Sequence, residues 1–251
     1  MSRATLLTPP ADLTQFLAQS SLFRGLPAAH LEAVLQAARY RQVERDAFFF
    51  HQGDLAAAVY LLLEGEAKLT WVTPEGYQML VRFVTPGEEL GVEAVLRDAV
   101  YMLSAQTVQD CRALTWEGQT LARLVEGYPR IAFNLLDLVA GYYERLLERY
   151  QELITARVEQ RLARALIRLA GQVGQATQIG VLIDLPLSRV DLAEMTGTTL
   201  YTASRILSRW EHQGLVETGR AWVLVRHLDA LAAIAEDVSP APPSEDLQES
   251  I

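Results

Sequence analysis

The 251-residue chain contains one cysteine, one lysine and no long apolar run. The lone Cys111 excludes an intramolecular disulfide framework. No stretch reaches the roughly 18 apolar residues that a membrane helix needs, and residues 1–12 lack the apolar segment of a secretory signal. We therefore expect a cytoplasmic protein without a membrane partner.

The net charge of −9 argues against a nucleic-acid partner until it is divided along the chain. Residues 1–154 carry 13 basic and 19 acidic side chains, and residues 236–251 carry five acidic and no basic ones. Residues 155–235 carry nine basic and seven acidic side chains, so the positive balance lies there. All basic residues except Lys68 are arginines, whose planar fork suits phosphate and guanine. A DNA-binding unit would therefore lie within 155–235 and bind in a salt-dependent manner.

Residues 187–211 predict two short helices joined by a tight turn. Ser188 and Asp191 form a capping-box-like start for the first helix. Gly197 can take the left-handed conformation that the turn requires, and Thr198 or Thr199 can cap the second helix. The expected buried apolar residues are Val190, Leu192 and Met195 on the first helix and Ala203, Ile206, Leu207 and Trp210 on the second.

This pattern predicts a helix-turn-helix, in which the second helix enters the major groove of DNA. A hairpin with strands at 215–217 and 221–225 would form a wing beside it. The alternative is a helical hairpin with a solvated outer face, which the caps, the glycine turn and the wing together disfavour. The expected DNA-contacting residues are Ser188, Arg189, Thr198, Thr199, Leu200, Tyr201, Thr202, Ser204, Arg205, Arg209 and Arg220.

The first half of the chain has strand-like runs at 48–54, 59–72 and 78–84, separated by glycine-containing turns. Such even spacing predicts a small rolled antiparallel sheet that can hold one small ligand. Residues 13–38 are expected to be mainly helical, with Pro27 at a helix start.

A long helix is predicted over 129–157, with Pro129 at its first position. It carries two apolar stripes and so needs two neighbours, of which the sheet supplies one and a partner chain's copy the other. A buried helix of a monomer is the alternative. The second stripe comprises Phe133, Leu136, Val139, Tyr143, Leu147 and Ile154. The expected dimer interface is the first stripe, namely Ile131, Leu135, Leu138, Tyr142, Leu146, Tyr150 and Leu153.

Together these segments resemble the Crp/Fnr family of bacterial transcription regulators over roughly residues 13–230. The helix-turn-helix carries most of the resemblance, followed by Pro86–Leu96 with Ser104 and Ala105. The resemblance implies an α+β fold with an N-terminal cupin-like β-roll, a long dimerisation helix and a C-terminal winged helix-turn-helix. It also implies a homodimer on a palindromic double-stranded operator, with RNA polymerase as a partner. The expected segments are an arm at 1–21, the roll at 22–128, the helix at 129–157, the DNA-binding domain at 158–235 and a disordered acidic tail at 236–251.

The family places its effector between the Pro86–Leu96 loop and the long helix. The corresponding residues here are Gly91, Glu93, Ala94, Tyr101, Leu103, Ser104, Ala105, Tyr142 and Leu146. Members that bind cyclic nucleotides have an arginine where this chain has Leu103, and a hydroxyl pair that corresponds without gaps to Leu146 and Leu147. Because a buried phosphate without a cation is costly, we expect the effector not to be cyclic AMP. It would be apolar or weakly polar, with Glu93, Tyr101 and Ser104 as its polar partners, or absent altogether.

Other classes fit less well. A cupin-type metal enzyme needs clustered histidines, a phosphate-transfer enzyme needs a phosphate-binding loop, and a cysteine nucleophile needs a histidine base, none of which the pattern offers. One cysteine cannot hold an iron–sulfur cluster. We therefore expect no enzyme, metal or cofactor. A haem sensor using His30 or His51 remains an alternative, as does a regulatory subunit that binds an effector but no DNA.

Overall fold

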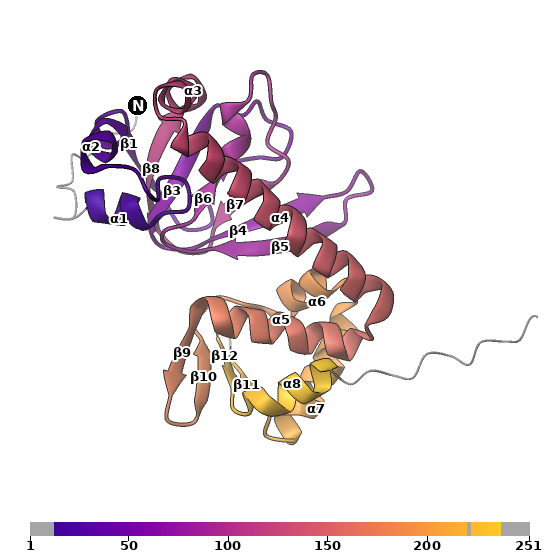
Figure 1. Cartoon of the computed structure of the whole chain (residues 1–251). Coiled ribbons are helices and arrows are strands. Elements are labelled where there is room, and N and C mark those ends of the chain that lie inside the picture. Colours follow the sequence, from indigo (N-terminus) through magenta and orange to yellow (C-terminus); the bar gives the residue numbers. More distant parts are fainter. Residues whose placement is uncertain (1–12, 220–221, 237–251) are drawn as a thin grey trace, which may run out of the picture. The chain divides into compact units, whose positions relative to one another are not determined.

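The computed structural model describes residues 13–219 and 222–236, in two compact units that divide between Gln151 and Glu152 (Figure 1). The predicted N-terminal arm up to residue 12, the wing-tip residue Arg220 and the tail after residue 236 lie outside the described residues. None of the helices in the described part is long and apolar enough to cross a membrane.

The first unit begins with two short helices, α1 (Leu13–Gln19) and α2 (Ala28–Gln36). Pro27 is the N-cap of α2, as its position in the sequence predicts. Two four-stranded antiparallel sheets follow, in the orders β1-β8-β3-β6 and β2-β7-β4-β5, so the predicted roll is confirmed. The strands are β1 (Arg39–Val43), β2 (Phe48–Phe50), β3 (Ala58–Glu64), β4 (Ala67–Val72), β5 (Gln78–Val84), β6 (Glu89–Leu90), β7 (Ser104–Thr107) and β8 (Cys111–Glu117).

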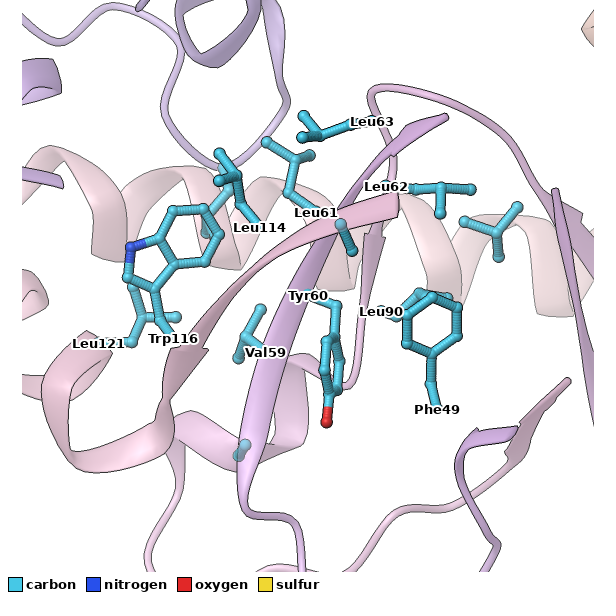
Figure 2. Packing of buried hydrophobic residues seen from close by; sticks show 14 of the residues in the cluster. Phe49, Val59, Tyr60, Leu61, Leu62, Leu63, Leu90, Leu114, Trp116 and Leu121 are labelled. Carbon is cyan, nitrogen blue, oxygen red and sulfur yellow. The ribbon is translucent and has the colours of Figure 1, made fainter. Parts of the chain in front are cut away.

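The core of the roll is centred on β3, which lies between β8 and β6 and is buried along five consecutive residues (Figure 2). Strand β8 supplies Leu114 and Trp116 to the same cluster. The indole nitrogen of Trp116 donates to the carbonyl oxygen of Val34 at 2.9 Å, which anchors α2 on the sheet. The core therefore combines apolar burial with a satisfied polar atom.

The apolar run at 59–72 forms two strands because the chain turns at Gly65. Gly65 has a φ of +84°, and a Cβ there would lie 2.3 Å from the carbonyl oxygen of Asp110. Only glycine fits both the backbone conformation and this close approach. The turn therefore brings β4 into the second sheet, where it pairs with β5 and β7.

A 3-10 turn η1 (Val92–Val95) and helix α3 (Gly118–Gly127) complete the roll and precede the long helix α4 (Arg130–Thr155). Helix α4 confirms the prediction to within two residues at each end, and Gly141 does not interrupt it. The division of the chain falls inside α4, so this helix is not a separate unit.

The second unit is built around α5 (Val158–Val173), whose residues Leu162, Leu166 and Leu169 are buried. The predicted helix pair is confirmed by α6 (Arg189–Thr196) and α7 (Leu200–His212). The predicted wing strands are confirmed by β11 (Val216–Thr218) and β12 (Val223–Val225). Helix α8 (Leu228–Glu236) packs on α5. The sequence pattern missed β9 (Gly174–Thr177) and β10 (Gly180–Ile183), which extend the wing to the sheet β11-β12-β10-β9.

The missed hairpin has a physical explanation. Strand β9 is polar and mostly exposed, so it shows no alternation of apolar residues. Strand β10 pairs with β12, which lies about 40 residues later in the chain. A partner so distant leaves no signal in a local window of sequence.

Candidate nucleic-acid interface and effector region

The two helices of the second unit are capped as the sequence predicts. The amide nitrogen of Asp191 donates to Ser188 Oγ at 3.1 Å, and the amide nitrogen of Ser188 donates to Asp191 Oδ2 at 2.8 Å. Gly197 adopts the left-handed conformation, with φ 59° and ψ 46°. Thr199, and not Thr198, caps α7, because its hydroxyl accepts from the amide nitrogen of Thr202 at 3.2 Å. Satisfied helix ends therefore set the angle between α6 and α7.

Helix α7 is divided sharply between a buried and an exposed face. The predicted inner residues Ala203, Ile206, Leu207 and Trp210 are all buried. On the outer face Tyr201 is 78% exposed, and Leu200 and Arg205 are exposed beside it. Arg205 makes no hydrogen bond or ion pair within the described part of the chain. This face offers an aromatic ring, an aliphatic side chain and an arginine fork to a partner.

Apart from Arg189, four of the predicted contacts are engaged within the fold, namely Ser188, Thr199, Thr202 and Arg209. The hydroxyl of Ser188 donates to Asp191 Oδ2 at 2.6 Å, and Thr202 is bonded to Thr199. Arg209 forms an ion pair with Glu159 of α5. Thr198 and Ser204 are half-buried, at the turn and on the side of α7 respectively.

Arg189, a predicted DNA contact, has several partners within the fold. Its guanidinium donates to Glu211 Oε2 at 2.9 Å, to Ser208 Oγ at 3.1 Å and to Thr218 Oγ1 at 3.2 Å. These bonds join α6 to α7 and to the first wing strand. Arg189 therefore holds the helix-turn-helix together and is not a free cation for phosphate. Val190, which was predicted to be buried, is exposed, whereas Leu192 is buried as predicted and Ala193 is buried beside it.

The exposed apolar residues of α4 form one regular stripe. They are separated by alternating steps of three and four residues, the spacing of the two core positions of a coiled coil. The stripe consists of Leu136, Val139, Tyr143, Leu146, Tyr150 and Leu153, all of them at least half exposed. Phe133, Leu147 and Ile154 flank it and are exposed as well.

This stripe differs from the predicted dimer interface. Ile131 is completely buried and Leu135 packs against the same core, so both belong to the interior of the first unit. Leu138 and Tyr142 are half-buried. From Leu138 to Tyr150 the predicted set takes successive steps of four, which carry it around the helix, whereas a seam must alternate three and four. Only Leu146, Tyr150 and Leu153 of the predicted set lie on the open stripe.

The polar groups assigned to the effector are engaged by the roll itself. The hydroxyl of Tyr101 donates to the carbonyl oxygen of Ala58 at 2.8 Å and accepts from the amide nitrogen of Ala58 at 3.0 Å. Ser104 Oγ accepts from the amide nitrogen of Gln52 at 2.9 Å. The tyrosine ring stacks on Phe50 with centroids 3.8 Å apart. Tyr101 and Ser104, both predicted as ligand contacts, therefore each form a hydrogen bond within the roll.

The remaining predicted effector residues are divided between the interior and the surface. Gly91 is left-handed, and a Cβ there would lie 2.8 Å from Tyr101. Ala94 and Ala105 are buried, whereas Glu93 and Leu103 are half-buried. Leu146 is exposed on the open stripe of α4, so it does not face the roll.

The sequence analysis missed Arg82, a nearly buried cation on β5. Its side chain is only 14% exposed and forms an ion pair with Glu88 at 2.7 Å. It also donates to the hydroxyl of Tyr142 at 3.1 Å, and the guanidinium lies over that ring, 5.3 Å from its centroid. Arg82 thus ties the roll to α4. Arg82 lies on β5, far in the sequence from Leu103, the position before Ser104 at which the family resemblance places a cation.

Glu89 is the most buried carboxyl group beside this cluster, at 2% exposure. Its Oε1 accepts from the amide nitrogen of Leu22 at 2.7 Å. Burial is the main cause that raises the pKa of Glu89 from 4.5 to about 6, partly offset by its backbone hydrogen bonds.

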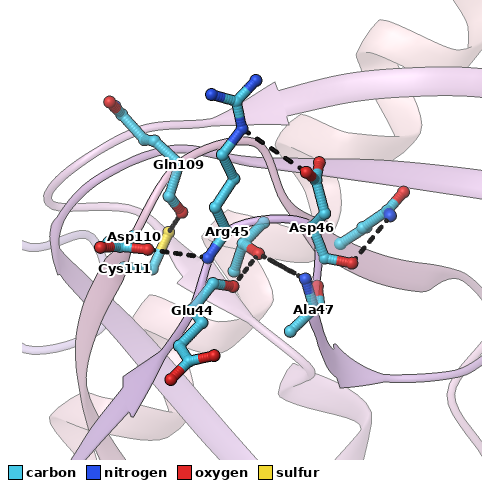
Figure 3. Close-up of polar contacts among 9 residues, drawn as sticks. Glu44, Arg45, Asp46, Ala47, Gln109, Asp110 and Cys111 are labelled. Atoms are coloured by element: carbon cyan, nitrogen blue, oxygen red, sulfur yellow. Dashed lines mark hydrogen bonds and ion pairs between the residues drawn. The ribbon is translucent and has the colours of Figure 1, made fainter.

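The candidate metal and redox residues are committed to packing. His30 stacks on Tyr128 with ring centroids 4.3 Å apart, and His51 lies against Phe48 in a tilted arrangement with centroids 4.2 Å apart. Cys111 is buried, and its Sγ donates to the carbonyl oxygen of Gln109 at 3.4 Å (Figure 3). It also donates to the carbonyl oxygen of Glu66 at 3.2 Å. Burial raises the pKa of the Cys111 thiol to about 11. Within residues 13–219 and 222–236, no group of three or more histidine, cysteine or carboxylate residues could hold a metal ion.

Comparison with known proteins assigns a family domain to each unit. Residues 40–128 match the cyclic nucleotide-binding domain, and residues 160–234 match the Crp-like helix-turn-helix domain. The "Cyclic AMP receptor protein" of Thermus thermophilus is 30% identical over 220 residues, which cover 86% of this chain and 97% of the relative. The "Nitrogen fixation regulation protein FixK" of Azorhizobium caulinodans is 28% identical over 74% of this chain and 75% of the relative.

Solved structures show the same architecture. The catabolite activator protein of Thermus thermophilus is 28% identical, with a TM-score of 0.51 over 88% of this chain and all of that one. The c-di-GMP responsive global regulator CLP of Xanthomonas campestris has a TM-score of 0.69 over 79% of this chain and 99% of that one. At 20% sequence identity, the likeness to CLP shows the fold alone.

The raised pKa of Glu89 makes the stability of the roll pH-dependent. The folded state disfavours the charged form of Glu89. The stability that the protonated side chain contributes is therefore fully present below the unfolded pKa and is lost as the pH rises through about 6. Glu89→Gln removes the titrating group. We therefore expect the free energy of unfolding of the variant, measured relative to that of the wild type, to increase by about 2 kcal/mol from pH 4 to pH 7. Urea unfolding at both pH values measures this, and an unchanged difference would contradict the assigned burial.

Proposed function

Because this chain belongs to the Crp/Fnr family of DNA-binding transcription regulators, we propose that it acts as a homodimer whose two α7 helices read a palindromic operator. The observation that carries the proposal is the outer face of α7. Its inner face packs fully, yet Tyr201, Leu200 and Arg205 remain exposed with no role in the fold. In a helix-turn-helix this is the face that enters the major groove.

The chemistry of that face favours a particular operator. Arg205 lies one turn into α7 and can form the bidentate contact with O6 and N7 of guanine. Tyr201 and Leu200 lie nearer the start of the helix and offer apolar contact, for which the thymine methyl group is the partner in the major groove. We therefore propose one guanine per half-site with a thymine beside it.

The dimer is proposed from the open stripe of α4. Six apolar side chains at coiled-coil spacing would pack against the same six of a second copy, since a two-fold axis pairs a surface with itself. A helix that buries one face on its own roll has only the other face for a partner. Two recognition helices about 34 Å apart then meet successive major grooves.

The effector is proposed to be neither cyclic AMP nor another ligand that requires a free cation. Leu103 offers no charge, and Arg82 is already neutralised by Glu88. Tyr101 and Ser104 use their hydroxyls within the roll. An apolar or weakly polar effector, or constitutive activity, fits these residues best. The names of the relatives include both a cyclic AMP receptor and a FixK regulator, so family membership does not decide the ligand.

The competing functions have less support. Haem ligation would require His30 or His51 to leave an aromatic contact. No catalytic role is proposed, since a Cys111 thiol with a pKa of about 11 holds little thiolate at neutral pH. RNA polymerase is proposed as the downstream partner on the strength of family membership.

The dimer proposal predicts that charges in the seam separate the subunits. Leu136→Asp combined with Tyr143→Asp should give a monomer, because the carboxylates would be buried without partners. The matched control is Leu96→Asp combined with Met102→Asp, at equally exposed positions of the roll, which should remain a dimer. Analytical ultracentrifugation measures both, and an intact dimer in the α4 variant would place the interface elsewhere.

The effector proposal predicts that cyclic AMP at micromolar concentrations gives no saturable heat in calorimetry and leaves DNA affinity unchanged. The physical reason is the cost of burying a phosphate without a free cation. A saturable heat together with tighter DNA binding would contradict it.

The reading proposal predicts a base-specific loss for Arg205→Ala. Affinity for the preferred site should fall by about 1–3 kcal/mol, and discrimination should relax at one base pair per half-site. Arg220→Ala, which the sequence places in the wing turn, should instead weaken all sequences alike and flatten the salt dependence. Binding-site selection with both variants measures this, and an unchanged base preference for Arg205→Ala would show that α7 is docked differently.

A further inference from the structure

Arg161, on α5, has a guanidinium that is engaged by backbone carbonyl groups from two separate segments. Its Nε donates to the carbonyl oxygen of Thr196 at 2.8 Å, and its Nη1 to that of Ala156 at 2.8 Å. Its Nη2 donates to the carbonyl oxygen of Gly197 at 3.4 Å. Burial lowers the pKa of Arg161, and the negative charge of Glu152 opposes this shift.

These carbonyl groups belong to the ends of two helices. Ala156 directly follows the last residue of α4, while Thr196 ends α6 and Gly197 is its C-cap. The last carbonyls of a helix lack intrahelical partners and carry the negative end of the helix dipole. One cation thus satisfies the C-terminal ends of both helices and holds them at a fixed separation.

Two further contacts tie the last turn of α4 to the same place. Leu153 Cδ2 lies 3.1 Å from the position that a Cβ of Gly197 would occupy. Glu152 forms an ion pair with Arg168 of α5 at 2.6 Å, with both side chains largely shielded from solvent. The chain divides between Gln151 and Glu152, so this last turn belongs to the second unit.

We infer that Arg161 is a positioning residue that couples the end of the dimerisation helix to the recognition helix. Gly197 lies two residues before Thr199, which is the N-cap of α7. A displacement of the last turn of α4 would therefore reach the start of α7 through Arg161. The inference rests on DNA binding by α7, and it requires neither the proposed dimer nor an effector.

Arg164 provides a matched control on the same helix. Its guanidinium also meets a backbone carbonyl at a helix end, that of Ala235 in α8, at 2.8 Å and 3.2 Å. Arg161→Gln and Arg164→Gln remove the same charge and comparable hydrogen bonds, but only Arg161 touches the turn before α7. The two variants therefore separate coupling to α7 from a general loss of stability.

The test compares DNA affinity and local exchange in the full chain. Arg161→Gln should weaken binding to a preferred site about tenfold, without changing base preference, because α7 keeps its side chains but loses its fixed position. Amide hydrogen exchange at residues 197–202 should accelerate in this variant alone. Arg164→Gln should bind DNA as the wild type does, and Arg161→Lys, which keeps the charge, should recover part of the affinity.

The outcomes are decisive in either direction. Equal losses of affinity in the two glutamine variants, or unchanged exchange at 197–202 in Arg161→Gln, would overturn the inference. If Arg161→Gln unfolds, Arg161→Lys and Arg164→Lys are compared instead, by the same measurements of amide hydrogen exchange and DNA affinity. A chain that binds no DNA even as wild type would instead contradict the function of α7 and not the role of Arg161.

Discussion

Helix α4 has two apolar faces, and the rest of the structure depends on how they are divided. One face is covered by the roll, through the buried Ile131 and the half-buried Leu135. Asn134 strengthens this contact, since its amide donates to the carbonyl oxygens of Leu22 and Arg24 at 2.9 Å and 3.0 Å. The other face stays open over five turns. An exposed apolar stripe of this length is unusual on a monomer, because apolar surface gains free energy when it leaves water.

Polar atoms define the interior of the first unit as much as apolar packing does. Tyr101, Ser104 and Trp116 each place their polar atom on a backbone group of another segment. Such bonds contribute little net stability, but leaving one of these buried groups unpaired would cost about 1–3 kcal/mol. The hydroxyl of Tyr101 both donates and accepts within the fold, so a ligand that took its donor hydrogen would have to break a contact of the fold. Ser104 Oγ accepts one bond from the amide nitrogen of Gln52.

Arginine carries out several different tasks in this chain, which has one lysine. Arg189 joins α6, α7 and the wing, Arg82 joins β5 to α4, and Arg161 joins the ends of α4 and α6. Each uses several donors of the planar fork at once, which an ammonium group cannot reproduce. Arg205 differs from them because its fork has no partner among the described residues. The surplus of basic over acidic side chains in residues 155–235 is modest, and the internal use of these arginines leaves fewer of them free for a partner.

The sequence by itself determined the features that depend on neighbouring residues. The capping box at Ser188, the left-handed Gly197, the two faces of α7 and the length of α4 follow from spacings of one to four residues, which local backbone geometry reads directly. Tertiary structure alone decided which stripe of α4 is covered, that β9 and β10 join the wing, and where the long side chains end. Arg161 meets Thr196 across 35 residues, and no local pattern encodes such a contact. A flexible arginine has many rotamers, and only the packed surroundings select one of them.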